Sequence, residues 1–256
     1  MIDLMDYPGI VLTISLAALS VAVWIGSMIA KRWRPANHEF RDDFSLVLSA
    51  TLTLLALIIG FTFSMAVSRY DQRKHVEEEE TNAIETEYFR LGLLPAPDAA
   101  KARMLLRDYY EERISFYSTR DSEQVRKMDE STLQLQGALW ATVNTVASVD
   151  HSPTIALTAS GMNDVLNSQG FAQAAAWNRI PSAAWLLMAF IAVFCHLQLG
   201  YWARSVRAER LLMMVLPLMC ALSFALIADV DSPRGGFIRI HPDNLESITQ
   251  TFDPKH

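Results

Sequence analysis

Four stretches of the sequence lack every Asp, Glu, Lys and Arg and are long enough to cross a lipid bilayer. They cover residues 10–30, 45–67, 183–199 and 211–228. A hydrocarbon core of about 30 Å is spanned by a helix of roughly 17 to 25 residues. The stretches form two pairs, and a short basic loop joins the members of each pair. The chain is therefore expected to be an integral membrane protein with four transmembrane helices.

The overall composition hides this division, because 51% of the residues are hydrophobic and 20% are charged when the whole chain is averaged. The hydropathy pattern predicts a membrane part interrupted by a polar insert. The predicted parts are a first transmembrane hairpin over residues 1–67, a soluble insert over 68–180, a second transmembrane hairpin over 181–228 and a C-terminal tail over 229–256.

The insert is expected to be helical throughout. No helix breaker follows the second membrane stretch until Pro95, which predicts one continuous helix from about Ser45 to Leu93. A further helix is predicted beyond Pro97, with Asp98 as its capping residue. Two more are predicted over residues 121–149 and 153–177, and Ser152 and Pro153 form a typical start for the last. Strand-like alternation is not evident. The predicted fold class is all-α, with four transmembrane helices in two hairpins and an inserted soluble helical bundle.

The basic residues of the two short loops predict the orientation in the membrane. They are Lys31, Arg32, Arg34 and Arg41 in the first loop and Arg204, Arg207 and Arg210 in the second. Short loops rich in Lys and Arg usually face the cytoplasm. The insert would then be periplasmic in a bacterial inner membrane. Arg69, Arg73 and Lys74, directly after the second stretch, argue for the opposite orientation.

Several functional classes are disfavoured. A net charge of −6 and a pI near 5.5 argue against a nucleic-acid partner. The two cysteines lie inside apolar stretches, so we expect no zinc site, and no cofactor motif or enzyme signature is present. The spans contain no carboxylate of the kind that a proton-driven carrier uses, whereas a passive pore needs none. The expected partners are lipid, inorganic ions and further copies of the chain.

Two ridges of small residues recur at intervals of four. One consists of Ala18, Ala22, Gly26 and Ala30, and the other of Ala56, Gly60, Ser64 and Ser68. Small residues at this spacing let membrane helices approach closely. Both ridges are expected to be packing surfaces, either within one subunit or between subunits.

Three polar features are candidate sites. The run Glu77 to Glu80 is expected to be a solvated helix face, because four consecutive helical residues do not converge on one ion. The pair Asp229 and Asp231 is either a turn held by Asp side chains or an acidic ring at a pore mouth. The intramembrane His196 is expected to be structural.

Short motifs along the chain resemble the bestrophin-like domain family, a group of membrane proteins named for remote similarity to bestrophin anion channels. These motifs are GFTFSMA at residues 60–66, SRYD at 68–71, NAI at 82–84, LLP at 93–95 and ADVDSPRG at 228–235. The resemblance spans most of the chain. One departure is the sequence Glu85, Thr86 and Glu87, where small residues would be expected.

The resemblance implies a function as well as a fold. Bestrophins are pentameric channels whose second helix lines a narrow apolar neck, and the equivalent candidates here are Leu55, Ile59, Phe63 and Val67. The resemblance implies a homo-oligomeric, pentameric ion channel with a preference for anions. It also implies a cytoplasmic insert, whereas the charges of the short loops predict a periplasmic one. The alternative is a non-conducting membrane module whose soluble bundle senses or scaffolds a partner.

Overall fold

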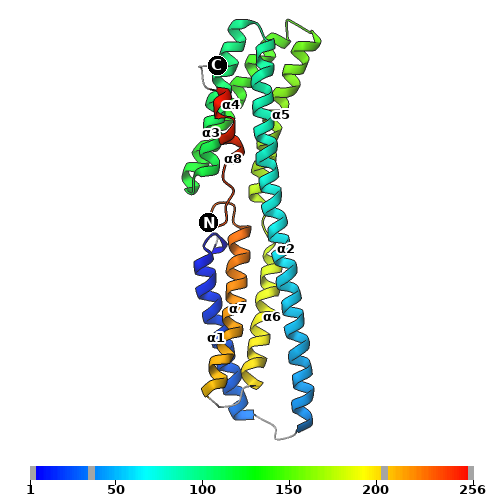
Figure 1. The fold of residues 1–256 in the computed structure, drawn as a ribbon, viewed down its shortest axis with the longest axis vertical. Helices are drawn as coiled ribbons and strands as arrows, with labels where there is room; N and C mark the ends of the chain where they lie inside the picture. The colour runs from blue at the N-terminus through cyan, green and yellow to red at the C-terminus, as the bar shows by residue number, and fades with distance from the viewer. Residues whose placement is uncertain (1–3, 34–37, 203–206, 253–256) are drawn as a thin grey trace. The chain divides into compact units, whose positions relative to one another are not determined.

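A computed structural model describes residues 4–33, 38–202 and 207–252 of the chain (Figure 1). Within these ranges every regular element is a helix, which confirms the predicted all-α class. The α-helices are α1 (Pro8–Trp33), α2 (His38–Arg90), α3 (Ala96–Ser118), α4 (Ser122–Ala147), α5 (Pro153–Trp177), α6 (Ser182–Trp202), α7 (Arg207–Asp231) and α8 (Asp243–Ser247). Three short 3-10 helices are η1 (Leu4–Asp6), η2 (Leu91–Leu93) and η3 (Thr249–Phe252).

The chain divides into two compact units. The membrane unit comprises residues 1–69 and 179–239, and the insert unit comprises residues 70–178 and 240–256. Helix α2 contributes residues to both. The segment after residue 228, expected to be one tail, is divided between the two units.

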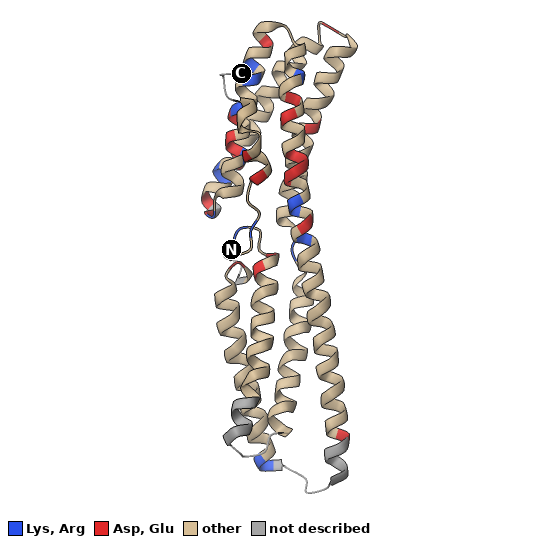
Figure 2. Cartoon of the chain, in the orientation of Figure 1, with Lys and Arg blue, Asp and Glu red and all other residues tan. Residues whose placement is uncertain are grey.

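Among the described residues, four helices are long and apolar enough to cross a membrane, and each overlaps one of the four predicted stretches. Long parts of these helices carry no charged side chain (Figure 2). Within the membrane unit α1 packs mainly on α6 and α7. The approach is close at Gly26 and Gly200, where an added methyl group would collide with the backbone of Leu197 and Val23 respectively. Glycine is therefore needed at both crossings.

The insert unit is a helical bundle formed by α3, α4, α5 and the later part of α2. Its core includes Ile84, Leu106, Leu139, Val143, Met162 and Val165, all with no exposed surface. Two of the helices have a capping residue near the predicted start. At the start of α4 the Asp121 side chain accepts a hydrogen bond from the amide of Glu123, and at the start of α5 the Ser152 side chain accepts one from the amide of Ile155. Asp98 differs from the expectation, because α3 begins at Ala96 and Asp98 lies in its first turn. Pro95 occupies the capping position instead, with Pro97 inside the first turn.

The C-terminal segment completes the core of the insert unit. Leu245, Ile248 and Phe252 are buried in it. The Phe252 ring stacks on Tyr110 at 4.4 Å between centroids, and the Tyr110 hydroxyl donates to the carbonyl of Leu245. Residues 243–252 are therefore a structural part of the bundle.

Candidate functional site

Helix α2 is the membrane helix least covered by its own unit. In the most apolar part of each candidate span, 17% of the residues of α2 are buried, compared with 44% for α7. Its covered face carries Leu48, Leu55, Thr62 and Ala66. Two contacts with α6 flank this face: the Thr51 hydroxyl donates to Gln198 Oε1 at 2.6 Å, and the Phe44 ring stacks with Trp202.

The exposed surface of α2 has two chemically different sides. Successive helical residues are about 100° apart, so residues two apart point in nearly opposite directions. One side is small or hydroxyl-bearing and includes Ser49, Thr53, Ala56, Gly60 and Ser64. The other side is large and apolar and includes Leu54, Leu57, Phe61 and Met65. A helix that only faced lipid would need only large apolar side chains on its exposed surface. The side with small and hydroxyl-bearing residues is therefore the candidate functional surface.

The two ridges of small residues have different environments. In α1, Ala22, Gly26 and Ala30 are buried, whereas Ala18 is exposed beside an apolar hollow of about 250 Å³. In α2, all four residues of the ridge Ala56, Gly60, Ser64 and Ser68 are exposed. A methyl group built on Gly60 would meet no atom of the described residues within 4 Å. The α1 ridge is used inside the chain, and the α2 ridge is available to a neighbouring molecule.

The four candidate pore residues do not share one environment. Leu55 is buried with 2% of its surface exposed, Ile59 and Val67 are half-buried, and Phe63 is 38% exposed. Each step of four residues turns the helix by about 40°. The series therefore starts on the covered face at Leu55 and moves toward the side of small residues at Phe63 and Val67.

Asp229 and Asp231 hold the chain where α7 ends. The Asp229 carboxylate accepts from the amides of Phe237, at 2.7 Å, and Ile238, at 3.2 Å. The Asp231 carboxylate accepts from the amide of Ile180, at 3.1 Å. Both residues are buried, at 6% and 1% exposure. These contacts favour the turn alternative, since the carboxylates are directed at backbone amides.

The same turn is tied to η1. The Ser232 hydroxyl donates to Asp6 Oδ1 at 3.0 Å, and Arg179 forms ion pairs with Asp6 and Asp231. Gly236 has a φ of +74°, which L side chains rarely adopt, and a methyl group there would also collide with the Asp229 carboxylate. Residues of the motif at 228–235 thus hold the turn after α7 against η1 and the segment just before α6.

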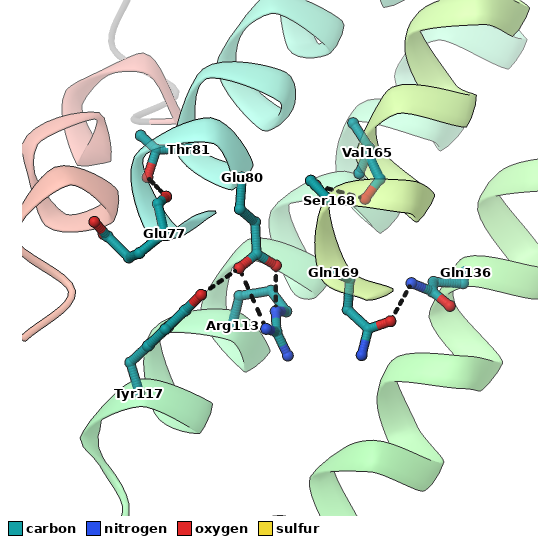
Figure 3. A network of polar contacts seen from close by, with 9 residues as sticks. All are labelled: Glu77, Glu80, Thr81, Arg113, Tyr117, Gln136, Val165, Ser168 and Gln169. Atoms are coloured by element: carbon teal, nitrogen blue, oxygen red, sulfur yellow. Dashed lines mark hydrogen bonds and ion pairs between the residues drawn. The ribbon is translucent and has the colours of Figure 1, made fainter. Parts of the chain in front are cut away.

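The insert unit contains a buried polar network (Figure 3). Glu80 of α2 and Arg113 of α3 have no exposed surface, and the Arg113 guanidinium donates to both Glu80 oxygens. The Tyr117 hydroxyl donates to Glu80 Oε2 at 2.8 Å. Burial lowers the pKa of Arg113, but the Glu80 carboxylate outweighs it and raises that pKa above the ordinary value. Arg113 is therefore a cation, and its two hydrogen bonds to Glu80 hold α2 to α3.

The expectation of a solvated face for Glu77 to Glu80 was wrong for its two outer members. Residues three apart share a helix face, so Glu77 and Glu80 point inward while Glu78 and Glu79 are exposed. Glu77 accepts from the Asn244 side chain, at 2.6 Å, and from the Leu245 amide, at 3.1 Å. Burial raises the pKa of Glu77, and the two hydrogen bonds oppose that rise. Arg113, inside the apolar stripe of its helix, was the available signal for a buried partner.

The remaining candidates are a metal-ligating cluster and His196. The described residues contain no group of three or more His, Cys, Asp or Glu side chains placed to hold a metal ion. His196 is buried in α6, and its Nδ1 lies 2.6 Å from the carbonyl oxygen of Ala192, one turn earlier. This contact fits the expected structural role.

The geometry defines a class: an integral membrane protein with four candidate spanning helices, an inserted helical bundle and one membrane helix with an uncovered small-residue face. The chain belongs to the bestrophin-like family, because the model of the Bestrophin-like domain matches residues 17–245. The resemblance stated from the motifs is thereby confirmed.

Solved structures with the same fold include those of a bacterial bestrophin homologue from Klebsiella pneumoniae. One variant is 13% identical, with a TM-score of 0.66, and the match covers 93% of this chain and 97% of the homologue. A second structure is 15% identical, with a TM-score of 0.65 and coverages of 94% and 96%. A search of curated proteins found no match. At such low identity these structures support the fold, and the function requires a separate argument.

Proposed function

We propose that the protein is a homo-oligomeric, passive ion channel whose pore is lined by α2. The observation that carries this proposal is the uncovered face of α2, which is small and hydroxyl-bearing in a helix that otherwise faces lipid. Four helices rarely enclose a path for ions, so the pore requires several copies of the chain. Membership of a family with a channel-type fold supports the same conclusion.

In the proposed assembly, neighbouring copies pack along the α2 ridge at Gly60 and Ser64. This packing brings Phe63 and Val67, on the adjoining side of the helix, toward the pore axis. Leu55 and Ile59 stay as lining candidates at the covered edge, with Leu55 contributing least. An apolar constriction of this kind gates by wetting and needs no buried charge.

The proposed subunit number and ion selectivity depend on the family resemblance, and the proposed orientation depends on the charges of the short loops. A pentamer and a preference for anions follow from the resemblance to bestrophins alone. We place the protein in a bacterial inner membrane with the insert unit in the periplasm, because the short loops are basic. The resemblance implies a cytoplasmic insert, and protease digestion of intact spheroplasts distinguishes the two orientations.

The test is ion flux through purified protein in liposomes, compared between two matched variants. Phe63→Ala shortens an exposed ring beside the small-residue side, and we expect a severalfold higher flux because the constriction widens. Phe61→Ala removes the same ring from the opposite, large apolar side, and we expect flux close to that of the original protein. Absence of flux at every voltage, pH and calcium level tested, or equal effects of the two variants, would contradict the proposed pore.

A non-conducting sensor or scaffold is the second candidate. It is favoured by Leu133 and Trp140 on α4, which are 65% and 41% exposed in the insert unit and provide apolar surface for a partner. A monomer in mild detergent that conducts no ions would support this alternative.

A further inference from the structure

Glu87 is a buried carboxylate that the proposed pore does not use. It lies on α2 within the sequence departure at residues 85–87 and has no exposed surface. The other two residues of this departure are not buried without a partner. Glu85 accepts a hydrogen bond from the Thr251 hydroxyl at 3.1 Å, and Thr86 is exposed. Glu87 instead points into the contact between α2 and α5.

Gly161 of α5 leaves room for this carboxyl group in the contact between the two helices. A methyl group on Gly161 would collide with Glu87 Oε2 and with the guanidinium of Arg90. Beside it, the Thr158 hydroxyl donates to the carbonyl of Arg90 at 3.3 Å and links α5 to α2. Glycine weakens a helix, so its presence at 161 favours a role in accommodating the acidic side chain.

The carboxyl group has few polar neighbours. Neither Glu87 oxygen has a hydrogen-bond partner among the described residues. The charged groups that act on it are Arg90 on its own helix and Asp164 on α5, and these two lie 3.9 Å apart, Nη1 to Oδ2. The pKa of Glu87 is raised to about 8, because burial and the nearby Asp164 raise it by more than Arg90 lowers it. Glu87 is therefore largely protonated at neutral pH.

We propose that Glu87 is a proton-sensitive latch between α2 and α5. The neutral carboxyl group remains in the narrow contact beside Gly161. The ionised carboxylate requires a partner or water, so it competes with Asp164 for Arg90 or leaves the contact, and either movement separates α5 from α2. The chain would thus couple external pH to the packing of the insert unit, whether or not it conducts ions.

The direction of the pH effect follows from the raised pKa. Because the folded chain holds this proton more tightly than the unfolded chain, Glu87 stabilises the fold fully below its ordinary pKa of 4.5. The stabilisation is lost progressively as the pH rises from there to about 8. Raising the pH should therefore weaken the α2–α5 contact.

The first test is infrared difference spectroscopy of the full-length protein in detergent. The carbonyl stretch of a protonated carboxylic acid should disappear as the pH is raised through about 8, the pKa at this site. Glu87→Gln should abolish that band. Glu78→Gln, which changes an exposed carboxylate on the same helix, should leave it. A band that is missing from the original protein near neutral pH, or that persists in Glu87→Gln, would overturn the proposal.

The second test measures the packing itself. Hydrogen exchange of the α5 segment around Gly161, corrected for the intrinsic effect of pH, should accelerate between pH 6 and pH 9 in the original protein and in Glu78→Gln. In Glu87→Gln, which is always neutral, the acceleration should be absent. Equal acceleration in all three proteins would contradict the latch.

Discussion

Glu80 and Arg113 form a buried ion pair in the insert unit. Arg113 lies over the Phe116 ring at 4.2 Å as well as against Glu80, so its guanidinium is surrounded by aromatic and carboxylate groups. A buried ion pair contributes little net stability, but removal of one partner leaves an uncompensated charge in an apolar interior. The network therefore enforces the pairing of α2 with α3.

We expect Arg113→Met to destabilise the fold by about 3–5 kcal/mol, because Glu80 would remain buried without its cation. The measurement is the thermal unfolding midpoint of the protein in detergent. Adding Glu80→Gln to this variant should recover part of the loss. Arg126→Met is the control, since Arg126 is 63% exposed and water screens its ion pairs with Glu123 and Glu130. Equal losses for Arg113→Met and Arg126→Met would show that the buried pair is dispensable.

The membrane helices differ in where they place their small residues. On α1 the small residues Ala22, Gly26 and Ala30 are buried, and Gly26 meets the backbone of Leu197 on α6. On α2 the equivalent spacing remains uncovered. One sequence pattern therefore serves packing within the chain in one helix and is free for packing between chains in the other.

Paired substitutions separate these two uses. Gly26→Ala should destabilise the chain by about 1–3 kcal/mol, because the new methyl group collides with a backbone carbonyl. Gly60→Leu should leave the fold of one chain intact, because the space there is open, and should weaken the oligomer. Light scattering after size-exclusion chromatography measures the oligomer, and thermal unfolding measures the fold. An unchanged oligomer in Gly60→Leu would exclude the α2 ridge as the contact between subunits.

For the molecule as a whole, each unit is assembled from segments that are far apart in the sequence. Residues 240–252 belong to the insert unit, where Leu245 is completely buried and Glu77 binds the start of α8. The core of the insert unit is therefore complete only after the chain has been synthesised beyond the second pair of membrane helices.

Removal of residues 240–256 should loosen the insert unit, because Tyr110 would lose both the stacked Phe252 ring and its hydrogen bond to Leu245. Limited proteolysis should then cleave α3 and α4 at least several times faster than in the full chain. A chain ending at Phe252 is the control and should resist cleavage as the full chain does. If the variant without residues 240–256 resisted cleavage as well as the full chain does, the C-terminal segment would not be needed to close the core.

Hydropathy and helix-breaking residues were sufficient to predict the four spans, the long helix that continues beyond the second span and the helical insert. They succeed because burial in lipid demands uncharged stretches of fixed length, and because proline and capping residues act locally. The motifs also identified the family. Which carboxylates of Glu77 to Glu80 are buried, which ridge of small residues is covered, and why Glu87 faces Gly161 were decided only by the tertiary structure. These properties depend on which helix lies opposite each face, and that pairing is set by contacts between residues distant in the chain.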